Sequence, residues 1–178
     1  VRPCMPRRML VAMQMEEFMT RRYELRFNRM KGCKEYRERH SLFTDYRPVT
    51  AEAVKSICFE AQLEGISAIE YDVQRYVDSR RVSHYWPIEE FLFDLPHWDG
   101  QDRIRALADC VPCENKEWRD FFYIWFLSMV AHWLQMDREH ANSTSPLLVG
   151  PQGCRKSSFC QSLLPPELRP YYVDGIDL

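Results

Sequence analysis

The residues from Leu147 to Phe159 constrain the fold most, because they join an apolar run to a glycine-containing loop and a helix-forming stretch. Pro146–Val149 is short and apolar, which is typical of a buried strand. Gly150 follows at once, and Lys156-Ser157 completes the spacing of a phosphate-binding loop, G-x-x-x-x-G-K-[ST]. The chain departs from that pattern at one position, where Arg155 replaces the second glycine.

Each residue type in such a loop has a physical task. Consecutive backbone N–H groups and the positive end of the following helix form a nest for phosphate oxygens. Lys156 is expected to reach the β- and γ-phosphates, and Ser157 to hold Mg²⁺. We therefore expect ATP and Mg²⁺ to be the ligands of this loop, and to bind weakly or not at all because of Arg155 and because half of the site is missing. The predicted nucleotide-binding residues are Gly150, Gln152, Gly153, Arg155, Lys156, Ser157 and Ser158.

The hydrophobic period changes along the rest of the chain. Residues 13–22 are typical of a short helix, and residues 23–28 alternate apolar and polar side chains as a half-buried strand does. Lys31-Gly32 provides a turn, so residues 33–37 can return as the partner strand. Further helices are expected from Thr50 to Gly65, over 69–79 and 87–95, from the capping residue Asp99 towards Pro112, and over 116–136 and 155–164.

These patterns predict a mainly α fold with a small N-terminal β-hairpin, followed by the start of a P-loop NTPase α/β domain that the chain is too short to finish. We expect a basic helix and hairpin over residues 1–45, a helical region over 46–142 and the incomplete P-loop domain over 143–178. Asp174 and Asp177 follow the loop helix too closely to be the acidic residue of a Walker B strand. No catalytic residue is therefore assigned.

Charge is distributed unevenly. Residues 1–39 carry 11 Lys/Arg against 5 Asp/Glu, whereas residues 40–78 carry 3 against 7. A basic end of this kind contacts nucleic-acid phosphates in some proteins and is simply a solvated face in others. Our candidate DNA contacts are Arg26, Arg29 and Lys34, and we expect any DNA binding there to be non-specific and weakened by salt.

Cysteine spacing and apolar run lengths exclude several classes. The longest apolar run, residues 121–134, is shorter than the roughly 20 residues of a membrane span, so it predicts a buried helix. Seven cysteines without a repeated spacing, and no secretory signal, indicate a reduced, cytoplasmic protein. Cys110 and Cys113 form an isolated C-x-x-C, and because a structural zinc site needs four ligands, we expect no zinc there.

Three segments together resemble the virulence-associated E (VirE) family, whose members are phage-, plasmid- and island-borne proteins similar to the helicase half of primase–helicases. They are Gly150–Phe159, Phe91–Ile104 with its Trp98-Asp-Gly phrase, and residues 163–172. The resemblance implies a superfamily 3-like ATPase that acts on single-stranded or forked DNA and assembles as a homo-oligomeric ring.

Two other functions fit part of the pattern. A non-catalytic DNA-binding or regulatory module with a decayed loop is favoured by Arg155 and opposed by the Lys156-Ser157 pair. A small-molecule kinase shares the strand–loop–helix chemistry, but the long helical region ahead of the loop argues against it.

Overall fold

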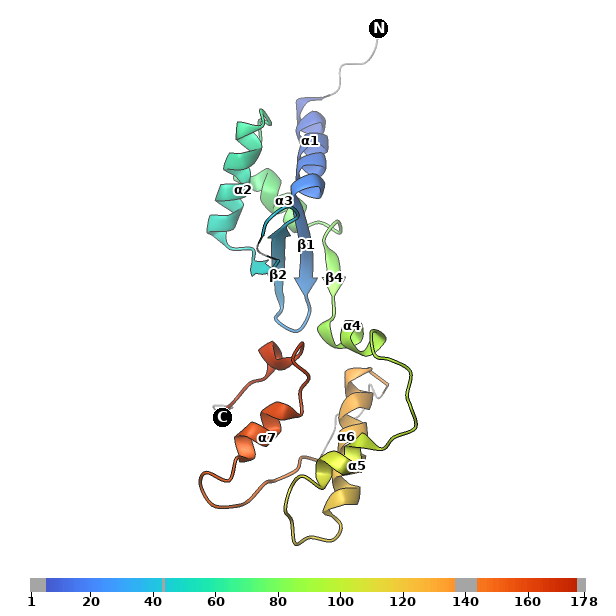
Figure 1. Ribbon diagram of the computed structural model, residues 1–178. Coiled ribbons are helices and arrows are strands. Elements are labelled where there is room, and N and C mark those ends of the chain that lie inside the picture. The colour runs from blue at the N-terminus through green and yellow to red at the C-terminus, as the bar shows by residue number, and fades with distance from the viewer. Residues whose placement is uncertain (1–5, 43, 137–143, 176–178) are drawn as a thin grey trace. The chain divides into compact units, whose positions relative to one another are not determined.

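The computed structural model describes residues 6–42, 44–136 and 144–175, and the chain divides into two compact units, Val1–Trp86 (unit 1) and Pro87–Leu178 (unit 2). Within the described residues the fold is mixed α/β, with seven α-helices and one four-stranded sheet (Figure 1). The expectation of a mainly α fold with only a hairpin is thus corrected, because two further strands extend the hairpin into a sheet.

Unit 1 contains the whole sheet. Its elements in chain order are α1 (Arg7–Arg22), β1 (Tyr23–Asn28), β2 (Cys33–Glu38), β3 (Arg47–Pro48), α2 (Ala51–Leu63), α3 (Glu70–Val77) and β4 (Ser83–Tyr85). The strand order is β3-β2-β1-β4; β1 and β2 are antiparallel, as are β2 and β3, while β4 runs parallel to β1. The predicted hairpin is confirmed. The strands β3 and β4 are too short to produce a recognisable alternation, so the sequence did not predict them.

The three helices of unit 1 are grouped together, and the β1–β2 turn points away from them (Figure 1). Gly32 in that turn has φ +64°, a conformation that glycine adopts without steric penalty. Thr50 caps α2 as expected, because its side chain accepts a hydrogen bond from the backbone N–H of Ala53 at 3.2 Å.

One hydrophobic core holds unit 1 together. Its buried residues come from the three helices, the start of β1 and the loop before α3: Val11, Met15, Phe18, Met19, Tyr23, Val54, Ile57, Cys58, Ala61, Ile66, Ala68, Val73 and Val77. Leu25 and Tyr36 pack against this core, so the alternate residues Glu24 and Arg26 of β1 face the opposite side of the sheet. The boundary expected near residue 45 falls inside this core, and the compact units divide at Trp86 instead.

Unit 2 is built from short helices and one long helix. They are α4 (Pro87–Phe93), α5 (Arg103–Ala108), α6 (Trp118–Trp133), α7 (Lys156–Ser162) and the 3₁₀ turn η1 (Arg169–Tyr171). The cap of α5 is Asp102, whose side chain accepts from the N–H of Arg105 at 3.0 Å, and not Asp99 as we expected. Asp99 instead accepts from the N–H of Gln101 and forms an ion pair with Arg103.

The long apolar helix α6 exists, but the prediction that it is buried is wrong for most of its length. Among its described residues only Phe122 is buried, and Phe121, Ile124 and Leu127 are exposed. The helix is apolar all round, so its sequence could not indicate which face packs. No helix in the described part of the chain is both long enough and apolar enough to cross a membrane.

The predicted strand before the loop is also absent. Residues 144–150 form no regular structure, and the side chains of Leu147 and Val149 are 85% and 86% exposed. A buried strand needs neighbouring strands for its backbone hydrogen bonds, and every strand in the described residues belongs to unit 1. The expected domain boundary at residue 142 lies outside the described residues.

Candidate functional site

The phosphate-loop residues form a tight turn directly before α7. The helix begins at Lys156, and Arg155 precedes it with φ +62° and ψ +28°, the left-handed conformation. Gly153 has φ +85°. A side chain in the left-handed region costs about 1 kcal/mol relative to glycine. The structure therefore gives a physical reason why glycine is usual before the lysine of such loops.

The ammonium group of Lys156 is turned back into the loop. Its Nζ donates to the carbonyl oxygens of Gly150 and Pro151, both at 2.9 Å, and lies 3.4 Å from Sγ of Cys154. The loop thus closes around the lysine, and the predicted partners Gly150 and Lys156 are brought together. A phosphate group that used this ammonium would have to replace the two carbonyl oxygens as hydrogen-bond acceptors.

The other predicted loop residues lie at the surface. Gln152, Gly153, Ser157 and Ser158 are all exposed, so the hydroxyl groups are accessible to solvent. The ring of Phe159, one residue further along α7, lies 6.1 Å from that of Phe122 and connects the helix to α6. A backbone turn and an ammonium group can donate hydrogen bonds to phosphate oxygens, and an exposed hydroxyl oxygen can be a ligand of Mg²⁺. These groups fit a magnesium-bound nucleotide.

Those residues considered for metal or acid chemistry that the structure describes do not gather into a site. Cys110 and Cys113 are exposed thiols, and no three His, Cys, Asp or Glu side chains gather in the described ranges in a way that could hold a metal ion. Asp174 is exposed, and Asp177 lies outside the described residues.

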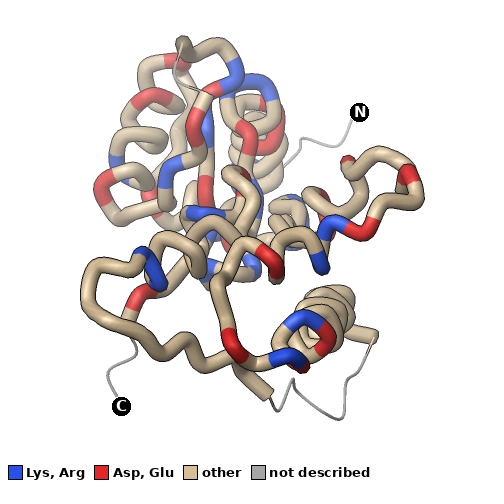
Figure 2. Tube along the Cα trace, turned by 60° about the horizontal axis from the view of Figure 1, so that its bottom comes forward, with Lys and Arg blue, Asp and Glu red and all other residues tan. Residues whose placement is uncertain are grey.

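The basic N-terminal residues are mostly paired with carboxylates. Arg26 binds Glu35 at 2.9 Å, and Lys34 binds Asp78. Further ion pairs join Arg21 and Arg22 to Glu64, Arg22 to Glu60, and Arg37 and Arg39 to Glu24. Basic and acidic positions are accordingly interspersed along unit 1 (Figure 2). The local excess of positive charge in residues 1–39 is thus largely balanced within the unit.

The three candidate DNA contacts do not form one patch. Arg26 lies on the sheet face opposite the helices, whereas Lys34 stands opposite Phe27 in the strand register and faces the other side. Arg29 belongs to the hairpin turn, where its guanidinium lies 4.3 Å from the centre of the Trp86 ring. No carboxylate pairs with Arg29 in the described ranges. DNA contact by these residues stays a prediction.

A buried carboxylate organises the sheet face around Arg26. Glu35 is 1% exposed and accepts hydrogen bonds from Arg26 at 2.9 Å, from Asn28 at 3.2 Å and from Lys31 at 3.0 Å. Burial opposes ionisation, but the hydrogen bonds from Lys31, Asn28 and Arg26 outweigh it and hold the pKa of Glu35 below its usual value. Glu35 is therefore charged at neutral pH and fixes the arginine in place.

Aromatic rings that the sequence analysis missed stack on these arginines. The guanidinium of Arg26 lies 3.6 Å from the ring centres of both Tyr46 and Tyr85, and that of Arg37 lies 4.8 Å from the Tyr46 ring. Tyr46 and the Tyr85-Trp86 pair stand at the ends of segments with few apolar residues. Such segments have no hydrophobic period, so their aromatic composition was the only signal in the sequence.

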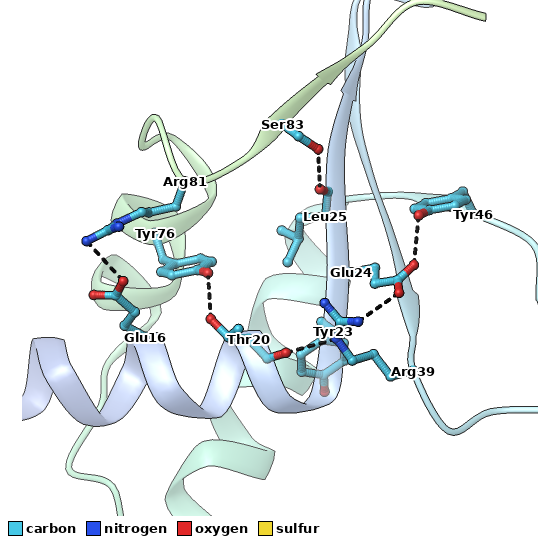
Figure 3. Close-up of a pocket in the computed structure, with 10 residues that line it drawn as sticks. All are labelled: Glu16, Thr20, Tyr23, Glu24, Leu25, Arg39, Tyr46, Tyr76, Arg81 and Ser83. Carbon is cyan, nitrogen blue, oxygen red and sulfur yellow. Dashed lines mark hydrogen bonds and ion pairs between the residues drawn. The ribbon is translucent and has the colours of Figure 1, made fainter. Parts of the chain in front are cut away.

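A cavity of about 520 Å³ lies in unit 1, beside the half of β1 that has no β4 neighbour. It is bordered by α1, β1, α3 and the start of β4 (Figure 3). Its side chains form cross-wall contacts: Arg39 with Glu24, Arg81 with Glu16, and Thr20 with the hydroxyl of Tyr76. The complete lining is Glu16, Thr20, Tyr23, Glu24, Leu25, Arg39, Tyr46, Tyr76, Arg81 and Ser83.

One comparison with known proteins gives a match, and it lies in the second half of the chain. Residues 92–175 match the virulence-associated protein E-like domain, which covers α5, α6, the phosphate loop and α7. No curated protein and no solved structure gives a significant match to the chain. The resemblance to the virulence-associated E family is therefore supported over this region.

Proposed function

We propose that this chain is part of a virulence-associated E-like ATP-dependent DNA helicase or primase–helicase of the cytoplasm, and that it binds nucleotide phosphate weakly through residues 150–158. The observation that carries the proposal is the loop closed around Lys156, inside a region that matches the virulence-associated protein E-like domain. The ammonium at the centre of this loop supports the proposal, because a phosphate group that displaced the two carbonyl oxygens would meet a cation there.

Each loop residue has a defined role in this proposal. Lys156 exchanges its bonds to Gly150 and Pro151 for bonds to phosphate oxygens, and Ser157 offers its exposed hydroxyl to Mg²⁺. Held there, Mg²⁺ would supply charge neutralisation on the phosphates for phosphoryl transfer. Gly150 and Gly153 allow the backbone to approach the nucleotide closely.

Arg155 is the reason to expect weak binding. Its side chain stands where glycine leaves room, and its left-handed conformation stores about 1 kcal/mol of strain in the loop. The same residue is the specific observation behind the alternative function, a non-catalytic DNA-binding or regulatory module with a decayed loop. In that case nucleotide does not bind at all.

Titration of the chain with ATP and Mg²⁺, followed by calorimetry or by NMR of the loop amides, tests the proposal. We expect a dissociation constant above about 1 μM, which corresponds to a binding free energy weaker than about −8 kcal/mol. Lys156→Ala should abolish the interaction, because the phosphate-binding cation is removed. Arg155→Gly should tighten it several-fold, because the strain and the bulk before Lys156 are both relieved.

Lys116→Ala is the matched control, since Lys116 is an exposed lysine in the same unit, ahead of α6. It should leave nucleotide affinity unchanged. Absence of binding to both the parent and Arg155→Gly would decide for the decayed loop. Binding that survives Lys156→Ala would show that the nucleotide occupies another site.

A further inference from the structure

β4 places Ser83 and Tyr85 on the sheet face opposite the helices, beside Arg26 and Asn28 of β1. Ser83 and Tyr85 are two residues apart, so they point to the same side of the strand. Ser83 lines the cavity at the start of β4, while Tyr85 stacks on Arg26 and is followed by Trp86, which stacks on Arg29. The cavity and the Arg29–Trp86 pair therefore stand at the two ends of β4, and we call the side chains from one to the other the β4 surface.

The arginines of this surface have two different tasks. Arg26 donates its N–H groups to Glu35, and Arg37 donates to Glu24. Both guanidinium groups are thereby held in place against the rings on which they stack, Tyr46 and Tyr85. Arg29 and Arg81 remain available to a ligand. Arg29 has no carboxylate partner in the described residues, and Arg81, 63% exposed, has one ion pair, to Glu16.

The cavity itself is suited to an uncharged polar group. Its lining contains two arginines and two glutamates, so their charges cancel. The hydroxyl groups of Thr20, Tyr76 and Ser83 can each donate or accept a hydrogen bond, as seen for Tyr76 with Thr20 and for Ser83 with the carbonyl oxygen of Leu25. A volume of about 520 Å³ lies within the range of small-ligand sites, roughly 300–1,000 Å³.

We propose that the β4 surface binds single-stranded nucleic acid, with one base in the cavity and the neighbouring phosphates at Arg29 and Arg81. The proposal rests on the DNA-directed function proposed above and adds the site on this chain. Rings and guanidinium planes stack with any base, and cavity hydroxyls match either donors or acceptors, so binding there is tolerant of sequence.

The net charges of the two units favour a polyanion as the partner of unit 1. Unit 1 carries 16 Lys/Arg against 12 Asp/Glu, a net charge of +4, while unit 2 carries 8 against 14, a net charge of −6. A polyanion is thus attracted to unit 1 and repelled by unit 2. Within unit 1 the stacks of Arg26 on Tyr46 and Tyr85 and of Arg29 on Trp86 give the β4 surface rings and guanidinium groups suited to bases.

The test is binding of a fluorescently labelled single-stranded dT oligonucleotide to the 178-residue chain, measured by anisotropy across a salt series. Ser83→Trp fills the mouth of the cavity from an exposed strand position, and Arg29→Glu reverses the unpaired cation. The controls are Ser56→Trp and Lys55→Glu, which make the same changes at exposed positions of α2.

We expect each β4-surface variant to bind about tenfold more weakly than the parent, and each α2 control to bind like it. Only Arg29→Glu should also lower the steepness of the salt dependence, by about 0.7 in the log–log slope for one lost phosphate contact. Lys156→Ala should leave DNA affinity unchanged, because its proposed ligand is the nucleotide.

The outcomes separate the two proposals. If the parent chain does not bind the oligonucleotide, both the DNA-directed function and the β4 surface are overturned. If it binds, but Ser83→Trp and Arg29→Glu bind as tightly as their controls, DNA contacts lie elsewhere and only the β4 surface is overturned. A loss in the Lys55→Glu control equal to that in Arg29→Glu would mean that overall charge, and not this surface, controls binding.

Discussion

Unit 1 and unit 2 use similar amounts of apolar sequence in opposite ways. In unit 1, three amphipathic helices cover one face of a sheet, and their apolar residues meet in a single core. In the described part of unit 2 the buried side chains are few, Pro87, Ile88, Ala108, Phe122 and Leu168, while long apolar residues of α6 are exposed. An apolar sequence can therefore predict a helix, but the burial of its side chains depends on which other elements pack against that helix.

The charges follow the same division. Unit 1 joins basic residues of α1 and β2 to acidic residues in α2 or directly after α2 and α3, so pairs such as Arg22 with Glu60 connect segments far apart in the chain. The ion pairs of unit 2 in the described ranges are local, as between Asp99 and Arg103, or join the neighbouring helices α5 and α6. Unit 1 therefore has the more cooperative contacts, and we expect it to be the more stable unit.

The largest expected loss of stability comes from replacing one buried phenylalanine in each unit, and it tests this comparison. Phe18 and Phe122 are both 1% exposed. Phe18→Ala should destabilise unit 1 by about 4 kcal/mol, because the tightly enclosed core cannot collapse into the space. Phe122→Ala should destabilise unit 2 by roughly half as much, since its neighbours Trp118 and Trp125 are partly exposed rings that can move inwards.

Hydrogen exchange of peptides from each unit, followed in increasing urea, measures the two losses separately. Tryptophan fluorescence adds an independent probe, because four of the five tryptophans, all but Trp86, belong to unit 2. Equal losses in the two units would contradict the view that unit 2 has the looser core.

The same contrast explains what could be predicted from the sequence. The β1–β2 hairpin and the capped helix α2 are confirmed, because a period of two, a turn glycine and an N-cap threonine act locally. Val73 and Val77 are buried on the one apolar side of α3, whereas Tyr71 is 65% exposed. These predictions needed no knowledge of distant partners.

Apart from the local cap expected at Asp99, the predictions that failed depended on partners. The strand expected at Pro146–Val149 has no neighbouring strand among the described residues of unit 2, and α6 has no single apolar side to orient it. The short strands β3 and β4 form only because the hairpin offers two edges for pairing. For the phosphate loop, the spacing of Gly150 and Lys156 indicated the turn, but the left-handed conformation of Arg155 is visible only in the structure.

The next effect in size concerns the paired charges of unit 1. Glu35→Gln removes the buried carboxylate that accepts from Arg26, Asn28 and Lys31, and should destabilise unit 1 by about 2 kcal/mol at pH 7. Because the folded-state pKa of Glu35 is lowered, its contribution is fully present above the unfolded pKa of about 4.3 and is lost as the pH falls through the folded value.

Urea unfolding of unit 1 at pH 7 and at a series of lower values measures this. The difference between parent and Glu35→Gln should shrink below about pH 4.3. The matched control in unit 2 is Asp109→Asn, which removes the exposed ion pair with Arg119 at 3.3 Å and should leave stability unchanged at every pH. A Glu35→Gln penalty that persists at low pH would mean that shape, and not charge, makes this residue important.

The smallest effect compares one helix cap from each unit. Thr50→Ala removes the acceptor for the N–H of Ala53 and should cost unit 1 about 1 kcal/mol. In unit 2, Asp102→Ala removes the acceptor for the N–H of Arg105, so that amide should lose its exchange protection while the rest of the unit stays folded. NMR exchange rates of these two amides measure both effects.

Asp99→Ala, at the position where the sequence placed the cap, is the control. Its carboxylate accepts from Gln101, outside α5, so the Arg105 amide should exchange as in the parent. If Asp99→Ala exposes that amide as much as Asp102→Ala does, then the ion pair of Asp99 with Arg103, and not the cap, holds the first turn of α5.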